Sequence, residues 1–307
     1  MASLEETAKA LRTRSLLEIH LAVFLFGFPG LFGKWIPLSP PLIVLGRVLF
    51  ASLALGLVLA IRRASLKIAP TRDLGLLVLC GFILAVHWTM FFRSVQISTV
   101  AVGLLSYSSF PVFTAFLEPL TLRERWDPWS LFFALLTMGG VFLMVPGYDL
   151  SNPIFQGILW GLGAGLTFAF LAVLNRNLCR RHSSLNVAFY QDFFAVLFLL
   201  PFAFLAELKL TWRTAGLLVL LGVFGTAAAH ALFINGMKRI GARTASIISA
   251  LEPVYGVALA LAFLKESPSL RTVSGGVVIL AAALTVSVRT GRPPKTKLRT
   301  GRPSSSA

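Results

Sequence analysis

Residues 101–124 read AVGLLSYSSFPVFTAFLEPLTLRE, and residues 243–266 read RTASIISALEPVYGVALALAFLKE. The two stretches match at an offset of 142 positions, so that Pro111 falls on Pro253 and Glu124 falls on Glu266. Each glutamate follows its proline by 13 positions and stands just past an apolar run. The offset predicts a chain built from two copies of one unit. A proline inside each apolar run is typical of a carrier with broken helices around a central site.

The composition indicates an integral membrane protein. Of 307 residues, 56% are hydrophobic and 13% are charged, and the mean hydropathy is +0.81. A soluble domain of this size would expose far too much apolar surface. The sequence predicts an all-α protein with ten transmembrane helices, because ten runs are long enough to span a bilayer. These runs are 17–35, 41–61, 73–95, 100–120, 129–146, 154–175, 185–206, 214–236, 244–264 and 271–289.

The charge distribution predicts the topology. A net charge of +16 would suggest nucleic acid as the partner of a soluble protein, but here 21 lysines and arginines fall on one set of loops and ends and six on the other. Cytoplasmic segments carry the excess of cations. We therefore expect a multi-pass protein of the cell inner membrane with both termini cytoplasmic, a lipid bilayer as its surroundings, and no nucleic-acid partner. Five spans per repeat make the second repeat inverted relative to the first.

Four segments follow from these spans. They are a cytoplasmic N-terminal segment (1–15), a first repeat (16–146), a second repeat (154–289) and a disordered basic cytoplasmic tail (290–307). The two cysteines, Cys80 and Cys179, imply no disulfide framework and no metal cluster, and no cofactor is expected.

Pro111 and Pro253 are the candidate hinges. A proline removes one hydrogen bond within a helix, and the freed carbonyl then needs a neighbouring helix or a wet cavity as its partner. A plain helix kink would explain either proline alone. Their recurrence at equivalent positions favours a cavity or hinge.

Six ionisable residues lie within the predicted spans, where such groups usually face the bundle interior. They are Arg47, His87, Glu118, Asp192, His230 and Glu252. Arg47 either pairs with a helix-end carbonyl or a carboxylate, or it binds a substrate carboxylate through both of its terminal nitrogens. Asp192 is its potential partner or a proton carrier, and Glu252 is the stronger candidate for proton coupling. Glu118 is expected to pair with Arg123 or Arg125.

Aromatic and small residues complete the predicted site. Trp88, Phe91, Tyr107, Trp160 and Tyr255 would form an amphipathic wall for an organic substrate, together with His87 and His230. A wholly structural role, in the core or toward lipid, is the alternative for each of them. The glycines Gly157, Gly161 and Gly165 repeat every four residues, a spacing that lets helices approach closely.

The motifs resemble those of one transporter family. The segment from His87 to Ser94, the run from Ala101 to Pro111, and the run from Ser246 to Pro253 with its closing Leu264-Lys265-Glu266 are similar to the two repeats of the EamA family, in the drug/metabolite transporter superfamily. Arg47 and Gly157-x-x-x-Gly161 fit the same pattern. The resemblance implies ten helices around a central cavity, and it is strongest to YddG-type exporters of amino acids.

We therefore expect an exporter of amino acids or related small organic metabolites that works by alternating access, and not an enzyme. An exchanger of phosphorylated metabolites or nucleotide sugars is the alternative, and it would need several cations in the cavity. A polytopic membrane enzyme would need a carboxylate cluster or a metal site near a membrane face. A lipid scramblase would need a polar groove facing lipid. The sequence leaves the oligomeric state open, with a monomer as the simplest expectation.

Overall fold

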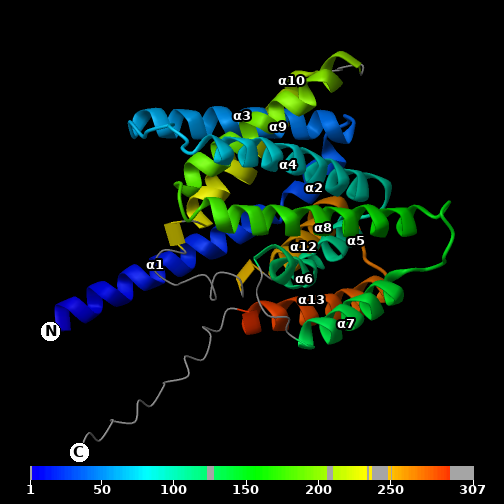
Figure 1. Ribbon diagram of the computed structural model, residues 1–307. Helices are drawn as coiled ribbons and strands as arrows, with labels where there is room; N and C mark the ends of the chain where they lie inside the picture. The colour runs from blue at the N-terminus through cyan, green and yellow to red at the C-terminus, as the bar shows by residue number, and fades with distance from the viewer. Residues whose placement is uncertain are drawn as a thin grey trace, which may run out of the picture.

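The computed structural model describes 2–122, 128–205, 210–233, 235–236, 248–249 and 251–290 (Figure 1). Glu124, Arg123, Arg125, the side chain of Glu118 and the tail after Thr290 lie outside the described part, so the predictions made for them stay predictions.

The described residues form helices joined by short loops. In the first half these are α1 (Ala2–Phe26), α2 (Pro29–Trp35), α3 (Pro40–Ile61), α4 (Thr71–Ile97), α5 (Val100–Tyr107), α6 (Phe110–Leu122) and α7 (Pro128–Met144). In the second half they are α8 (Pro153–Leu178), α9 (Ser184–Leu205), α10 (Trp212–Gly222), the π-helical η1 (Val223–Ala228), α12 (Glu252–Leu264) and α13 (Leu270–Thr290).

These helices supply ten spans, as predicted. Within the described residues, seven helical segments are long and apolar enough to cross a membrane, and three shorter apolar helices lie in α7, α12 and α13. Three of the seven segments join elements that a bend or a change of helix type separates, namely Thr13–Trp35, Val100–Leu117 and Trp212–Phe233. The predicted fold class, an all-α membrane protein, is confirmed.

Both motif prolines stand at the second position of a helix that begins in mid-span. The fourth span breaks at Ser108 and Ser109, and α6 then begins at Phe110. In the second half α12 begins at Glu252, again 142 positions on. Proline is well tolerated at a helix start because its missing amide would have no partner within the helix. The repeated sequence therefore encodes a helix break at the same place in each half.

Serine hydroxyls stabilise the first of these breaks. The Ser108 hydroxyl donates to the Leu104 carbonyl at 2.7 Å, and the Ser109 hydroxyl donates to the Ser106 carbonyl at 2.7 Å. The same two carbonyls also accept the backbone amides of Ser108 and Ser109, so each serine binds the end of α5 through its amide and its hydroxyl.

The two halves interleave rather than form separate domains. The most extensive helix contacts are those of α4 with α8, of α7 with α13 and of α3 with α9. Figure 1 shows α7 and α13 side by side along one edge of the bundle. Each of these pairs takes one helix from each half, so the central space is bounded by both repeats.

The glycine face of α8 makes one of these contacts possible. A Cβ atom would lie 2.3 Å from the Ser98 hydroxyl at Gly157, 2.6 Å from the Ser106 Cβ at Gly161, and 2.9 Å from the Ser109 hydroxyl at Gly165. Any larger residue would push α8 away from α5 and from the break that follows it. The expected close approach of helices at these glycines is confirmed.

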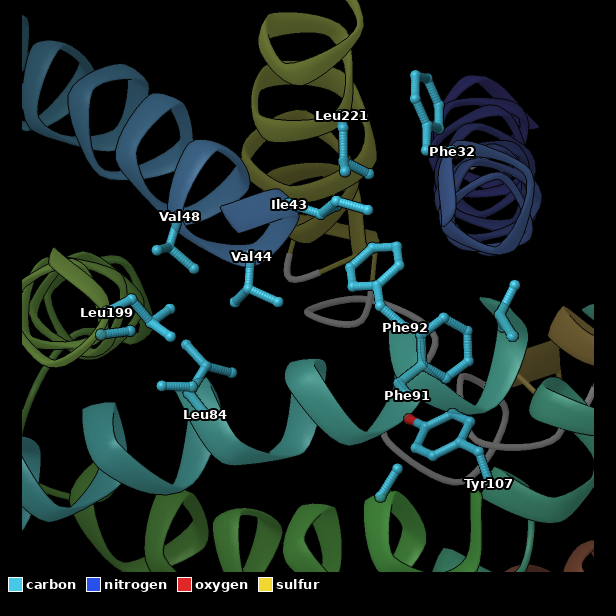
Figure 2. Packing of buried hydrophobic residues seen from close by; sticks show 14 of the residues in the cluster. Phe32, Ile43, Val44, Val48, Leu84, Phe91, Phe92, Tyr107, Leu199 and Leu221 are labelled. Carbon is cyan, nitrogen blue, oxygen red and sulfur yellow. The ribbon is translucent and has the colours of Figure 1, made fainter. Parts of the chain in front are cut away.

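The main hydrophobic core lies between α3, α4, α9 and α10 (Figure 2). Phe91 belongs to this core, with 3% of its surface exposed, and its ring lies 5.9 Å from the Tyr107 ring. Leu84 of α4 and Leu199 of α9 pack in the same cluster. The core fixes α4 against the second half and so fixes the direction in which Trp88, on the same helix, points.

Candidate functional site

A cavity of about 430 Å³ lies in the middle of the bundle and takes its walls from both halves. Its polar lining residues are Arg47, Trp88, Tyr107, Ser108, Asn175, Gln191, Asp192, Thr226, His230, Ser249 and Glu252. Pro111 and Pro253 also line it, so both helix breaks stand at its wall. A mostly apolar cavity with a few convergent polar groups is typical of a small-molecule site.

The cavity extends toward one side of the membrane. Two of its lining residues stand near helix ends: Asn175 close to the end of α8 and Ala188 close to the start of α9. These ends lie on the side where α1 begins (Figure 1). We call this the N-terminal side.

A charged cluster joins three elements on the opposite side. The Lys34 ammonium at the end of α2 donates to the Ser98 carbonyl at 2.7 Å and lies 3.6 Å from the Glu266 carboxylate. The Val100 amide, at the start of α5, donates to the other oxygen of Glu266 at 2.9 Å. Glu266 thus caps α5 and satisfies one of the amides left free at a helix start. The sequence marked this glutamate as part of the motif but did not predict its partner.

Arg47 is the most buried charged residue at the cavity wall, with 0% of its surface exposed. Its Nε donates to the Thr226 hydroxyl at 2.8 Å, and its Cζ lies 3.4 Å from the centroid of the Trp88 ring. The Thr226 hydroxyl in turn donates to the Leu221 carbonyl at 3.2 Å. The hydroxyl and the ring therefore hold one edge and one face of the guanidinium.

The other edge of the guanidinium is free. Within the described residues neither Nη1 nor Nη2 of Arg47 has a hydrogen-bond partner. A buried charged donor without a partner is unfavourable, so the site favours an anion at this edge. The structural role considered for Arg47 was a bond to a carbonyl or a carboxylate, but its observed partner is a threonine hydroxyl 179 positions away.

Two carboxylates face this guanidinium without contacting it. Asp192 on α9 and Glu252 at the start of α12 are the acidic groups whose charges act on Arg47. Neither lies within ion-pair distance, because no pair within 4.0 Å joins Arg47 to an acid in the described chain. Asp192 therefore makes no ion pair with Arg47 in the described structure, and its role as partner of Arg47 or as proton carrier stays a prediction.

The two histidines occupy different positions. His230 lines the cavity and donates from Nδ1 to the Thr226 carbonyl at 2.8 Å. His87 is absent from the lining and donates from Nδ1 to the Ala164 carbonyl at 2.9 Å. Its ring packs against Trp88, Tyr107 and Phe168. His87 therefore supports the wall from behind.

The structure brings two of the five predicted aromatic residues to the cavity. Trp88 and Tyr107 line the cavity, whereas Phe91, Trp160 and Tyr255 do not. Phe91 is in the core, Trp160 is on α8 with 38% of its surface exposed, and Tyr255 packs against Phe24 with ring centroids 5.7 Å apart. These three were placed wrongly because the sequence does not fix how each helix is rotated.

Phe110 and Phe168 line the cavity and were not predicted. The Phe110 ring stacks on Tyr107 at 5.3 Å, and the Phe168 ring meets Phe110 edge to face at 4.9 Å. Phe110 precedes the motif proline, a signal that could have identified it. Phe168 and Thr226 carry no comparable signal in the sequence.

The cavity can bind and enclose a small molecule through these groups. Within the described residues, no group of three His, Cys, Asp or Glu side chains is arranged to hold a metal ion. The geometry offers one anion-binding edge, two acidic groups and several aromatic rings.

Comparison with known proteins gives one family. The model of the EamA-like transporter family matches residues 14–145 and 155–288. The uncharacterised transporter YxxF of Bacillus subtilis is 27% identical over 288 residues, which cover 92% of each chain. The S-adenosylmethionine uptake transporter of Rickettsia prowazekii is 27% identical over 213 residues, covering 67% of this chain and 69% of that one.

Two further comparisons concern location and fold. The inner membrane transporter YicL of Salmonella typhimurium, also uncharacterised, is 30% identical over 164 residues, covering 52% of this chain and 54% of that one. A crystal structure with 16% identity matches with a TM-score of 0.63, covering 91% of this chain and 99% of its own. At that identity the match shows a common fold alone.

Proposed function

Since the chain belongs to the EamA-like transporter family and is thus a multi-pass membrane transporter of small molecules and not an enzyme, we propose that it exports amino acids or related small organic metabolites. The proposed mechanism is alternating access around the central cavity, with the helix breaks at Pro111 and Pro253 as hinges. The more specific part of this proposal is that the substrate is an amino acid, as for exporters of YddG type.

The observation that carries the proposal is the free edge of Arg47. A guanidinium held by Thr226 on one edge and by Trp88 on one face presents its two remaining nitrogens in a fixed orientation. This is the geometry that binds a carboxylate through two parallel hydrogen bonds. Because Arg47 has no exposed surface, the side chains that cover it must move when the carboxylate arrives.

The remaining groups fit the rest of an amino acid. Glu252 would meet the ammonium, and the rings of Tyr107, Phe110 and Phe168 would contact the side chain. Trp88 positions Arg47, since the guanidinium already covers its ring face. His230 lines the cavity and would contact the substrate. His87, Phe91, Trp160 and Tyr255 do not line it and could affect the substrate only by positioning the residues that do. Proton coupling at Glu252 or Asp192 stays a prediction.

The proposed location is the cell inner membrane with both termini cytoplasmic. The excess of lysine and arginine on the N-terminal side supports this orientation. The relative YicL is described as an inner membrane transporter. In this orientation the cavity is open to the cytoplasm, and the cluster of Lys34 and Glu266 closes the periplasmic side.

S-adenosylmethionine is a second candidate substrate, because a relative is described as its uptake transporter. It carries an amino-acid end, which Arg47 and Glu252 would bind, and a purine, which the aromatic rings would contact. An exchange of phosphorylated metabolites is disfavoured, because Arg47 is the single lysine or arginine that lines the cavity in the described structure.

Transport by purified protein in liposomes tests the proposal. The parent should exchange labelled amino acids, and Arg47→Lys should raise KM about tenfold or more, because an ammonium keeps the charge but loses the two-pronged geometry. Arg93→Lys, at an exposed arginine of α4, is the matched control and should transport like the parent. Transport confined to phosphorylated sugars, or an unchanged KM for Arg47→Lys, would contradict the proposal.

A further inference from the structure

The charges of the cavity do not balance one another. Its lining contains one cation, Arg47, and two acids, Asp192 and Glu252. His230 is the other titratable side chain with basic character, and its Nδ1 donates to the Thr226 carbonyl. Tyr107 supplies a neutral hydroxyl. With both acids ionised, the empty cavity carries one more negative charge than positive charge.

Asp192 has no partner of its own in the described structure. It is 5% exposed and lines the cavity, and no hydrogen bond or ion pair within the described chain uses its carboxylate. Gln191 donates one side-chain N–H to the side-chain oxygen of Asn175, and no hydrogen bond from either amide to Asp192 occurs in the described structure. A buried carboxylate that lacks a partner is unfavourable unless a cation or a proton arrives.

The two acids lie on different elements of the cavity wall. Glu252 belongs to the helix break at the start of α12. Asp192 lies on α9 beside Gln191, whose partner Asn175 is close to the end of α8 on the N-terminal side. The charges of both acids act on Arg47, so both are near the position at which a substrate carboxylate would bind.

We propose that this cavity takes an amino acid with a second cationic group, so that Arg47 binds the carboxylate, Glu252 the α-ammonium and Asp192 the cation of the side chain. The inference rests on the proposed function and names its substrate class. Such a molecule has one negative and two positive charges, the complement of the cavity. A neutral side chain would leave Asp192 buried and unpaired, so the site selects against it.

The aromatic rings of the cavity wall also favour an amino acid with a cationic side chain. Phe168 and Phe110 stand at the wall with their rings edge to face, 4.9 Å apart. An ammonium, guanidinium or sulfonium group is attracted further when it lies over the face of an aromatic ring. The Trp88 face is already covered by Arg47, so the side-chain cation would use the phenylalanines.

Lysine and norleucine test the inference, because they share one carbon chain and differ in the terminal ammonium. We expect the parent protein in liposomes at pH 7 to transport lysine with a KM at least tenfold below that for norleucine. Asp192→Asn should raise the KM for lysine about tenfold and leave or lower the KM for norleucine. Asp73→Asn, which removes a carboxylate outside the cavity, is the control and should leave the ratio of the two KM values unchanged.

The possible outcomes distinguish a failure of this inference from a failure of the proposed function. If norleucine is transported as well as lysine, or if Asp192→Asn weakens both equally, the inference is overturned and the proposed function stands. Norleucine transport that brings a proton with each molecule would also overturn it, because a proton then neutralises Asp192. Transport of neither amino acid would overturn the inference, and it would overturn the proposed function as well if the other amino acids and S-adenosylmethionine were also not transported. Thermal unfolding with and without lysine gives a second readout: stabilisation of the parent that Asp192→Asn loses supports the inference, and equal stabilisation overturns it.

Discussion

Replacing Glu266 with alanine should open the side of the bundle opposite the cavity entrance. Its carboxylate receives the Val100 amide at 2.9 Å and lies 3.6 Å from the Lys34 ammonium. These contacts join the end of the ninth span to the first and fourth spans. We expect these contacts to break when this side opens, so their loss should favour the conformation that is open there.

The magnitude follows from the two contacts. A hydrogen bond to a charged group contributes about 1.5 to 3 kcal/mol. The ion pair adds little, at most about 1 kcal/mol, because both side chains keep more than a fifth of their surface exposed and solvent screens them. A total of about 2 to 3 kcal/mol shifts a two-state equilibrium roughly 30- to 150-fold, since about 1.4 kcal/mol corresponds to a factor of ten.

Accessibility of the cavity from the closed side is the assay. In a variant with Cys80 and Cys179 replaced, Ser108→Cys places one thiol at the cavity wall. A membrane-impermeant maleimide added to the side opposite the N-terminus should react about 30- to 150-fold faster in Glu266→Ala than in the parent.

A carboxylate on the same side provides the control. Hydrogen bonds from the Ser151 hydroxyl and amide hold the pKa of the exposed Asp149 carboxyl below its usual value, and they stay within its own loop. Asp149→Asn should therefore leave the labelling rate unchanged. Equal rates in Glu266→Ala and the parent would show that this cluster does not set the conformational equilibrium, and the reasoning would fail.

Three further predictions follow from the site, the glycine face and the topology. Thr226→Val leaves the Nε of Arg47 buried without a partner, so KM for an amino acid should rise by about tenfold or more. The control is Thr214→Val, at a buried threonine outside the cavity, and an equal rise in KM there would point to general damage to the protein. Gly161→Ala places a methyl 2.6 Å from Ser106 and should destabilise the protein by about 1 to 3 kcal/mol in thermal unfolding, whereas Gly216→Ala meets no atom within 4 Å and should not; similar melting temperatures for both would refute the close contact. A tag at Ala307 should be reached by protease only from the cytoplasmic side, and cleavage from the periplasm would reverse the assigned orientation.

The sequence predicted the spans and the helix breaks well because both depend on local chemistry. Length and hydropathy define a membrane span, and a proline disfavours continuation of a helix, although Pro119 and Pro201 lie inside α6 and α9. The offset of 142 therefore places the starts of α6 and α12 correctly, at Phe110 and Glu252. These features need no knowledge of what lies beside them.

The walls of the cavity could not be predicted in the same way. A membrane helix is apolar both toward lipid and toward its neighbours, so its sequence lacks the polar stripe that fixes the rotation of a soluble helix. Trp88 and Phe91 are three residues apart on α4, yet one lines the cavity and the other belongs to the core. The bond between Arg47 and Thr226 joins residues 179 positions apart and depends on the packing of both halves.

The charged cluster at Glu266 has both a signal in the sequence, namely the repeated motif, and contacts that depend on how the helices pack. At the offset of 142, Lys34 falls on Arg176 and Glu266 falls on Glu124, so the sequence carries a cation and an acid at both pairs of positions. Glu124 lies outside the described residues, and its contacts stay a prediction. The recurrence of a cation and an acid at the repeat offset predicts that the contact between Lys34 and Glu266 has a counterpart in the first half. In an inverted repeat equivalent positions fall on opposite sides of the membrane. The effect expected for Glu266→Ala is therefore a property of the repeat and not of one loop.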